Sequence, residues 1–235
     1  MSEAERGRKL KGILYGVGVG PGDPELMTVK AVKTLQKVQW IAVPDTGGDK
    51  SALSIAVPYI EGKPRIFCPT PMTRDRETLQ KAHEEGVRLI TEKLDMGEDV
   101  AFITLGDPSV YSTYMYLHRL VGEAGYEARM IPGVPSFCAA AAALNISLCD
   151  GGEPLHILPA SYEGTEELLH LNLKGSKVLM KSGRSLAEVK EKLREMGFGD
   201  RVQMAECCSM ENERLYHSLD EIPDQSSYFS ILIVK

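Results

Sequence analysis

The sequence predicts an α/β protein with two lobes, the first built around a mostly parallel sheet and the second around a mixed sheet. In the first half of the chain, short apolar runs alternate with amphipathic segments, the pattern of strands joined by crossover helices. After Pro132-Gly133, strand-like runs follow one another with a single convincing long helix between them, which indicates antiparallel hairpins. We therefore expect domains at residues 12–133 and 134–235, preceded by a disordered tail at residues 1–11.

The first lobe contains five predicted strands that are rich in Val, Ile, Leu and Phe and mostly end at Gly or Pro, as buried parallel strands do. They cover residues 13–19, 38–43, 65–68, 100–105 and 128–131. Between them, apolar residues recur at helical spacing over residues 26–35, 79–94 and 111–121.

In the second lobe, a run of small residues at 136–144 predicts a helix packed closely against a neighbour, and residues 185–196 predict the long helix. The strand-like runs there cover residues 155–158, 177–180, 202–206, 214–218 and 228–234.

Composition narrows the class of protein. The chain has 235 residues, 43% of them hydrophobic, so it can bury a core without disulfides. Its five cysteines are irregularly spaced with no CxxC pair, which disfavours a zinc ribbon or a secreted disulfide scaffold. A net charge of −6 argues against broad nucleic-acid binding. The charged start and the lack of a long apolar run argue against a secretory signal or a membrane span. We expect a cytoplasmic enzyme.

A glycine-rich turn, GVGVGPGDP at residues 16–24, closes the first predicted strand. The third glycine of a dinucleotide-binding GxGxxG would fall at Pro21 or Asp23, and no Gly-Lys-Ser/Thr of a P-loop follows. Asp23 and Pro24 form a strong helix start, with Asp as N-cap and Pro in the first turn. By itself this turn fits a simple strand-to-helix connection almost as well as a ligand site.

The same turn chemistry recurs at two other strand ends. Gly106-Asp107-Pro108 follows the strand that ends at residue 105, and Pro132-Gly133 follows the strand that ends at residue 131. In a parallel sheet the carboxyl ends of strands share one edge, where ligands of open α/β folds bind. Capping explains each turn singly, but the set favours a ligand site at this rim.

Taken together, GVGVGPGDPELMTVKA (16–31), TLGDPSVYSTY (104–114) and IPGVPSFCAAAAAL (131–144) resemble the tetrapyrrole (corrin/porphyrin) methyltransferase family. The resemblance extends over about residues 12–234. Within the family, GDPSVYSTY, LMKSGR (179–184) and SYFSI (227–231) look like the C20-methyltransferases of cobalamin synthesis, which methylate precorrin-2 or cobalt-factor II.

This resemblance implies two α/β domains with the active site in the cleft between them, and a homodimer. It also implies S-adenosylmethionine as the methyl donor, held largely by backbone groups. Here Pro135-Ser136 replaces the family's frequent Thr-Ala or Thr-Ser. By position, the implied cofactor-binding residues are Pro21, Leu105, Gly106, Asp107, Val110, Ser136, Phe137, Met180, Lys181 and Ala205.

The implied tetrapyrrole substrate carries many carboxylates, so an acidic enzyme must concentrate positive charge locally to bind it. Arginine suits bidentate carboxylate binding, although any one of these cations could also belong to a solvated loop. Tyr111 and Ser112 begin a predicted helix, where core packing is the alternative role. The substrate-binding candidates are Lys50, Arg74, Arg76, Tyr111, Ser112 and Arg184.

No residue is identified as a catalytic acid or base. Transfer of a sulfonium methyl needs orientation and desolvation more than proton transfer, and no Ser-His-Asp or paired-carboxylate pattern occurs. The histidines lack metal-ligand spacing, so we expect no protein-bound metal, and any cobalt would belong to the substrate.

The alternatives are a uroporphyrinogen-III or precorrin-4 methyltransferase, and more distantly a diphthine synthase or an rRNA 2′-O-methyltransferase, the last disfavoured by the acidic charge. A non-catalytic tetrapyrrole- or nucleotide-binding protein is an alternative of another class.

Overall fold

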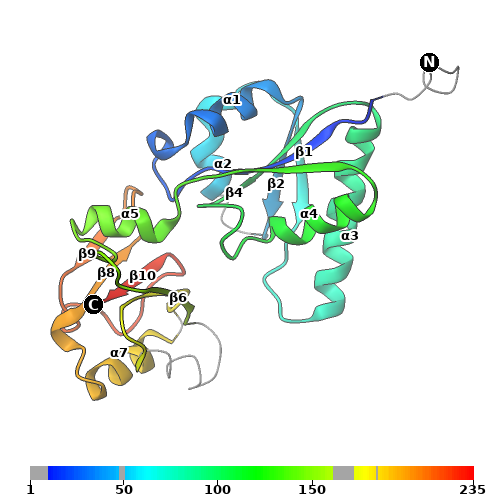
Figure 1. Cartoon of the computed structure of the whole chain (residues 1–235). Coiled ribbons are helices and arrows are strands. Elements are labelled where there is room, and N and C mark those ends of the chain that lie inside the picture. The colour runs from blue at the N-terminus through cyan, green and yellow to red at the C-terminus, as the bar shows by residue number, and fades with distance from the viewer. Residues whose placement is uncertain (1–9, 48–50, 161–171, 184) are drawn as a thin grey trace, which may run out of the picture. The chain divides into compact units, whose positions relative to one another are not determined.

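The computed structural model describes residues 10–47, 51–160, 172–183 and 185–235. The chain divides into two compact units, Met1–Pro135 and Ser136–Lys235, each with its own five-stranded sheet (Figure 1). The first sheet is parallel and the second is mixed, so the predicted fold class is confirmed. The domain limits at residues 12–133 and 134–235 and the site in a cleft stay predictions, and most of the expected tail lies outside the described residues.

In the first unit the strand order is β3-β2-β4-β1-β5, which places β1 between β4 and β5. Gly18 of β1 is aligned with Thr104 of β4, and Val17 with Ile131 of β5, so the carboxyl ends of these three strands lie at one edge. The strands are β1 (Ile13–Gly18), β2 (Trp40–Asp45), β3 (Arg65–Pro69), β4 (Val100–Thr104) and β5 (Glu127–Ile131).

Helices cover both faces of this sheet. Alternate side chains of β1 explain why: Val17 joins one apolar core with α1 (Val29–Lys37) and α2 (Ser51–Ala56), whereas Leu14 joins another with α3 (Arg76–Asp95) and α4 (Tyr114–Glu123). The chain therefore leaves neighbouring strands β1 and β4 toward opposite faces. This reversal is the point of an open α/β sheet where ligands bind.

Local details differ from the predicted helices. Pro24–Leu26 form only a 3₁₀ turn capped by Asp23, and α1 begins at Val29, where Thr28 Oγ1 accepts the Ala31 N–H at 3.1 Å. The prediction that the third helix starts at residue 111 is wrong because Tyr111 has a φ of 49°, which no right-handed helix contains. Helix α2 was not predicted, and a 3₁₀ turn, Val57–Tyr59, follows it.

The second unit has strand order β6-β7-β10-β8-β9. Among the strands that the structure describes in this unit, only β6 and β7 are parallel neighbours, and β10 runs antiparallel to both β7 and β8. Two predicted strands are shorter than expected, β9 ending at residue 216 and β10 beginning at residue 230. The strands are β6 (Leu155–Pro159), β7 (Ser176–Met180), β8 (Val202–Glu206), β9 (Arg214–Tyr216) and β10 (Ser230–Val234).

Two α-helices of the second unit match the predicted ones. Helix α5 (Ser136–Ala143) packs against β8 and β10, and α7 (Leu186–Glu195) contributes Leu186, Val189 and Leu193 to the unit's apolar core. A 3₁₀ turn, Gly199–Arg201, leads into β8. Within the described ranges no helix of the chain combines the length and apolarity needed to cross a membrane.

Candidate functional site

Two of the glycine-rich turns are joined directly. Gly20 donates its N–H to the Gly106 carbonyl at 3.3 Å, and Gly106 donates to the Gly20 carbonyl at 2.8 Å. Both residues have positive φ, 80° and 68°, a conformation that glycine adopts without steric cost. Pro21, a predicted cofactor residue, is buried immediately after this bridge.

The third turn packs against the same bridge. The Gly133 N–H donates to Asp107 Oδ2 at 3.0 Å, and Thr28 Oγ1 donates to the Pro132 carbonyl at 3.2 Å. A Cβ on Gly133 would lie 2.1 Å from the Gly106 oxygen. The predicted convergence of the three turns at one rim is thus confirmed, and we call residues 18–21, 105–112 and 132–133 the glycine rim.

Asp107 fixes the shape of the loop after β4. Its Oδ1 accepts hydrogen bonds from the Ser109 N–H at 2.8 Å and from Ser109 Oγ at 2.5 Å, while Oδ2 accepts from Gly133. Because the carboxylate binds these donors of the protein, Asp107 clamps two loops together. The loop containing Leu105, Gly106 and Val110 is held in place by this clamp, which suits a ligand bound by backbone groups.

The substrate-binding candidates of this loop differ in environment. Tyr111 is 46% exposed and has the left-handed φ noted above, a strained conformation for a bulky residue and one that clusters at functional sites. The Ser112 hydroxyl lies 2.8 Å from Thr104 Oγ1 and accepts the Tyr114 N–H at 3.2 Å. Ser112 therefore shapes the start of α4.

The sequence did not predict the contacts of Tyr114, which hold the end of this loop against the sheet. Tyr114 is fully buried, and its hydroxyl donates to the Arg129 carbonyl at 3.0 Å and lies 2.9 Å from His118 Nδ1. A Cβ on Gly16 would lie 2.1 Å from the Tyr114 ring, so this glycine makes room for the ring. Burial raises the pKa of Tyr114, which keeps the phenol protonated as a donor. The one sequence signal was a glycine inside a strand, ahead of the turn.

Of the predicted cations, Arg74 and Arg76 lie exposed in the loop after β3 and at the start of α3. Between them, Asp75 caps the helix by accepting the Thr78 N–H at 2.8 Å. Hydrogen bonds from the Thr78 side chain and backbone lower the pKa of Asp75. Lys50 and Arg184 lie outside the described residues.

The second unit brings Met180, Lys181 and Ala205 together at one edge of its sheet. Met180 of β7 and Ala205 of β8 are both aligned with Ile231 of β10, one on each side. Lys181 follows with a φ of 61°, and burial lowers the pKa of its amine. The remaining predicted cofactor residues of this unit, Ser136 and Phe137, form the first turn of α5, and Phe137 is buried.

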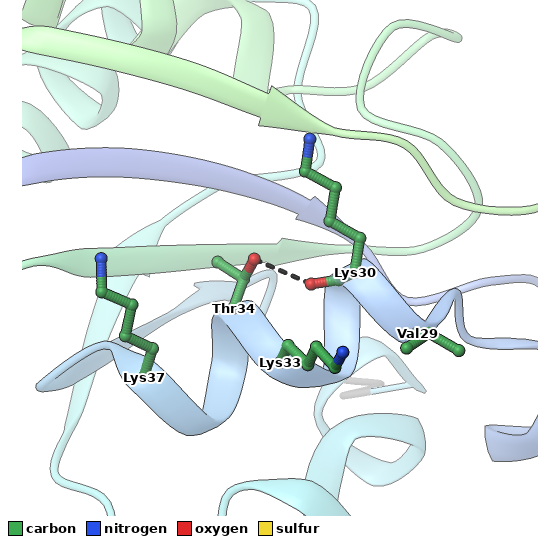
Figure 2. Close-up of a pocket in the computed structure, with 5 residues that line it drawn as sticks. All are labelled: Val29, Lys30, Lys33, Thr34 and Lys37. Carbon is green, nitrogen blue, oxygen red and sulfur yellow. Dashed lines mark hydrogen bonds between the residues drawn. The ribbon is translucent and has the colours of Figure 1, made fainter.

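A different concave surface lies on the outer side of α1, where Figure 2 shows three lysines along the helix. Lys37 is 3.8 Å from Asp99, and Thr34 Oγ1 donates to the Lys30 carbonyl at 2.8 Å. This surface is basic, and none of the residues predicted for the cofactor or the substrate lines it. In the part of the chain that the structure describes, no group of three His, Cys, Asp or Glu side chains could hold a metal ion.

Comparison with known proteins agrees with this geometry. Residues 13–223 match the family model of the tetrapyrrole (corrin/porphyrin) methylases. The chain is 36% identical to a probable cobalt-precorrin-2 C(20)-methyltransferase of Methanocaldococcus jannaschii, over 97% of each protein. It is 30% identical to the cobalt-precorrin-2 C(20)-methyltransferase of Salmonella typhimurium, over 96% of this chain and 97% of that protein.

A solved structure shares the fold. It is a uroporphyrin-III C-methyltransferase of Thermus thermophilus in complex with S-adenosylhomocysteine, with a TM-score of 0.69 at 21% identity, covering 95% of this chain and 97% of the other. The family model alone spans most of the chain, which confirms the resemblance carried by the three motifs. The chain belongs to the tetrapyrrole (corrin/porphyrin) methylase family.

Proposed function

We propose that the protein transfers the methyl group of S-adenosylmethionine to C20 of precorrin-2 or of its cobalt form, cobalt-factor II, in cobalamin synthesis. The observation that carries this assignment is the nearly full-length similarity to proteins named C20-methyltransferases, at 30–36% identity. It agrees with the C20 branch expected from the motifs. In sequence, by contrast, a cobalt-precorrin-4 C(11)-methyltransferase of Priestia megaterium matches over only 57% of the chain.

The glycine rim fits the methionine and ribose parts of the donor. Its turns occupy the switch point between β1 and β4, and the Asp107 clamp fixes a loop whose N–H and C=O groups can bind a polar ligand. We assign Pro21, Leu105, Gly106, Asp107 and Val110 to this role. Ser136, Phe137, Met180, Lys181 and Ala205 complete the proposed cofactor residues.

Bound S-adenosylmethionine supplies an activated methyl on a positively charged sulfur. The protein's task is to orient this group, exclude water and leave the sulfonium without a competing nucleophile. A rim of glycines, fixed carbonyls and neutral hydroxyls suits the orienting task, and its one carboxylate, Asp107, accepts hydrogen bonds from protein donors. The rim needs no side chain that gains or loses a proton to do this work.

For the macrocycle we assign Arg74, Arg76, Tyr111 and Ser112, together with Lys50 and Arg184. The two arginines and Tyr111 are exposed, as a site for a large polyanion requires. We further propose a cytoplasmic homodimer. Light scattering coupled to gel filtration checks the mass, and a monomer at micromolar concentration would exclude that state.

The direct test is incubation with methyl-labelled S-adenosylmethionine and either precorrin-2 or cobalt-factor II, followed by NMR of the product. We expect label at C20 with at least one of the two substrates. Label at another carbon, or on uroporphyrinogen-III instead, would assign the protein to another branch. Tight binding of donor and tetrapyrrole without transfer would identify a non-catalytic binding protein.

A further inference from the structure

Three residues with left-handed backbone lie at one edge of the second unit's sheet. They are Lys181 after β7 (φ 61°), and Cys207 and Ser209 after β8 (φ 49° and 64°). Because β10 is antiparallel to both β7 and β8, the carboxyl ends of those strands lie on either side of the start of β10. Non-glycine residues hold this conformation only where their surroundings enforce it.

The Ser209 N–H donates to Glu213 Oε2 at 2.7 Å, whereas the surroundings of Cys207 and Lys181 depend on the Glu206 carboxylate. Its Oε1 accepts hydrogen bonds from Ser226 Oγ at 2.6 Å and from the Ser227 N–H at 2.9 Å, and its Oε2 accepts from the Tyr216 hydroxyl at 3.4 Å. These bonds fix residues 226–229, which we call the serine loop and which lead into β10. The Phe229 carbonyl of this loop accepts the N–H of the strained Cys207 at 3.0 Å.

The serine loop in turn covers the residues after β7. A Cβ on Gly183 would lie 2.4 Å from the Ser227 oxygen and 2.9 Å from the Ser226 oxygen, so the two backbones are in close contact. Gly183 is two residues after Lys181. Glu206 therefore acts on both strained strand ends, through Cys207 on β8 and through Gly183 on β7.

A polar group without a partner among the described residues, the Ser182 hydroxyl, lies between Lys181 and Gly183 in the chain. Ser182 is fully buried, and its hydroxyl has no hydrogen-bond partner in the described structure. Proteins pair nearly all such groups, so this hydroxyl marks the segment after β7 as one whose conformation is set by the contacts around it. The next residue toward the strand is Lys181, a proposed cofactor contact.

We infer that Glu206 is a positioning residue for S-adenosylmethionine binding: through the serine loop it holds Lys181, and the end of β8 next to Ala205, in the conformation that receives the donor. This inference rests on the proposed function. Glu206 itself need not contact the donor, because its carboxylate is bound to Ser226, Ser227 and Tyr216.

The test is titration calorimetry of S-adenosylhomocysteine into the full-length protein and three variants. Glu206→Ala removes the acceptor, and we expect binding at least about tenfold weaker. Glu206→Gln keeps one oxygen that can accept from Ser226 and Ser227, and we expect it to restore affinity to within about threefold of wild type. The matched control is Glu221→Ala, which removes a carboxylate that accepts the His217 N–H at 2.8 Å elsewhere in the same unit. We expect the control to bind normally.

Steady-state kinetics separate a positioning role from a purely structural one, because a merely structural residue would not change the KM for one substrate alone. For Glu206→Ala we expect a raised KM for S-adenosylmethionine with kcat and the tetrapyrrole KM near wild type, all compared at the same folded fraction. A variant that melts earlier but binds S-adenosylhomocysteine with unchanged affinity would overturn the inference. If the wild-type protein fails to bind S-adenosylhomocysteine, the proposed function is wrong instead.

Discussion

At the scale of single residues, the glycine rim depends on glycines whose missing Cβ atoms let other groups approach. Gly18 and Gly133 admit neighbouring backbone, whereas Gly16 admits the ring of Tyr114. The rim glycines were recognisable in the sequence because they follow apolar strands in short motifs. The Gly16–Tyr114 contact could not be recognised in the sequence, because the two residues are far apart in the chain and only the order of the strands brings them together.

Gly16→Ala should destabilise the protein by about 1–3 kcal/mol, because the added methyl would overlap a buried ring in a packed core. Chemical denaturation measures this change. Gly122→Ala is the control, since Gly122 lies in α4 with open space around its Cβ position, and there alanine should add about 0.5–1 kcal/mol of stability. Equal effects at the two sites would contradict this packing.

Glu206 also predicts a pH dependence. Burial raises its pKa, but the hydrogen bonds from Ser226 and Ser227 outweigh burial and bring the pKa below its ordinary value of 4.5. A carboxyl whose pKa is lowered by folding stabilises the protein above its unfolded pKa, and this contribution is lost as the pH falls through the folded pKa. Below about pH 4.5 the wild type should therefore lose stability faster than Glu206→Gln. If the melting temperatures of the two proteins fell by the same amount from pH 6 to about pH 3, the lowered pKa of Glu206 would be contradicted.

At the scale of elements, helices and strands with clear periodicity were predictable to within a few residues. Helix α2 was not, because it has only six residues and four of them are buried, so it lacks the polar face that marks a surface helix. The sequence predicts a helix start at Asp23, but Asp23 caps only the 3₁₀ turn Pro24–Leu26. A second cap, Thr28, begins α1 at Val29. The sequence predicts a helix from Tyr111 because it does not reveal the positive φ of this residue.

Helix α7 makes an element-scale prediction through a buried amine. Lys190 Nζ donates to the Ile222 carbonyl at 2.5 Å and to Asp224 at 2.6 Å, and its side chain is only 6% exposed. Lys190→Met should cost about 1–3 kcal/mol, since the Ile222 carbonyl would lose its charged donor. Lys192→Met on the same helix removes a surface pair with Glu195 and should change stability by less than about 0.5 kcal/mol. Similar losses in the two variants, measured by urea unfolding, would rule out the special role of Lys190.

At the scale of the whole molecule, the chain combines a net charge of −6 with a proposed polyanionic substrate. The net charge of the protein therefore does not attract the substrate over long range, and substrate binding must depend on local cations. The sequence identified Arg74 and Arg76 from their loop, and the structure places both on the surface of the first unit. Which side chains bind the macrocycle cannot be predicted from periodicity or turn motifs, because it depends on the shape of the bound ligand.

The double variant Arg74→Ala/Arg76→Ala should raise the tetrapyrrole KM by about threefold to tenfold and leave the affinity for S-adenosylhomocysteine unchanged. The increase should shrink at high salt, where the wild-type advantage is screened. Arg119→Ala, an exposed cation on α4, is the control and should leave both constants unchanged. An unchanged tetrapyrrole KM in the double variant would remove these arginines from the substrate site.

The most direct test of the account is a crystal structure of the protein with S-adenosylhomocysteine. We predict that the ligand lies against the backbone of residues 105–110, with the Asp107 bonds to Ser109 and Gly133 intact and open space beside its sulfur for a macrocycle. Ligand bound elsewhere, for instance on the lysine surface of α1, or a sulfur enclosed by protein on every side, would contradict a methyl-transfer site at the glycine rim.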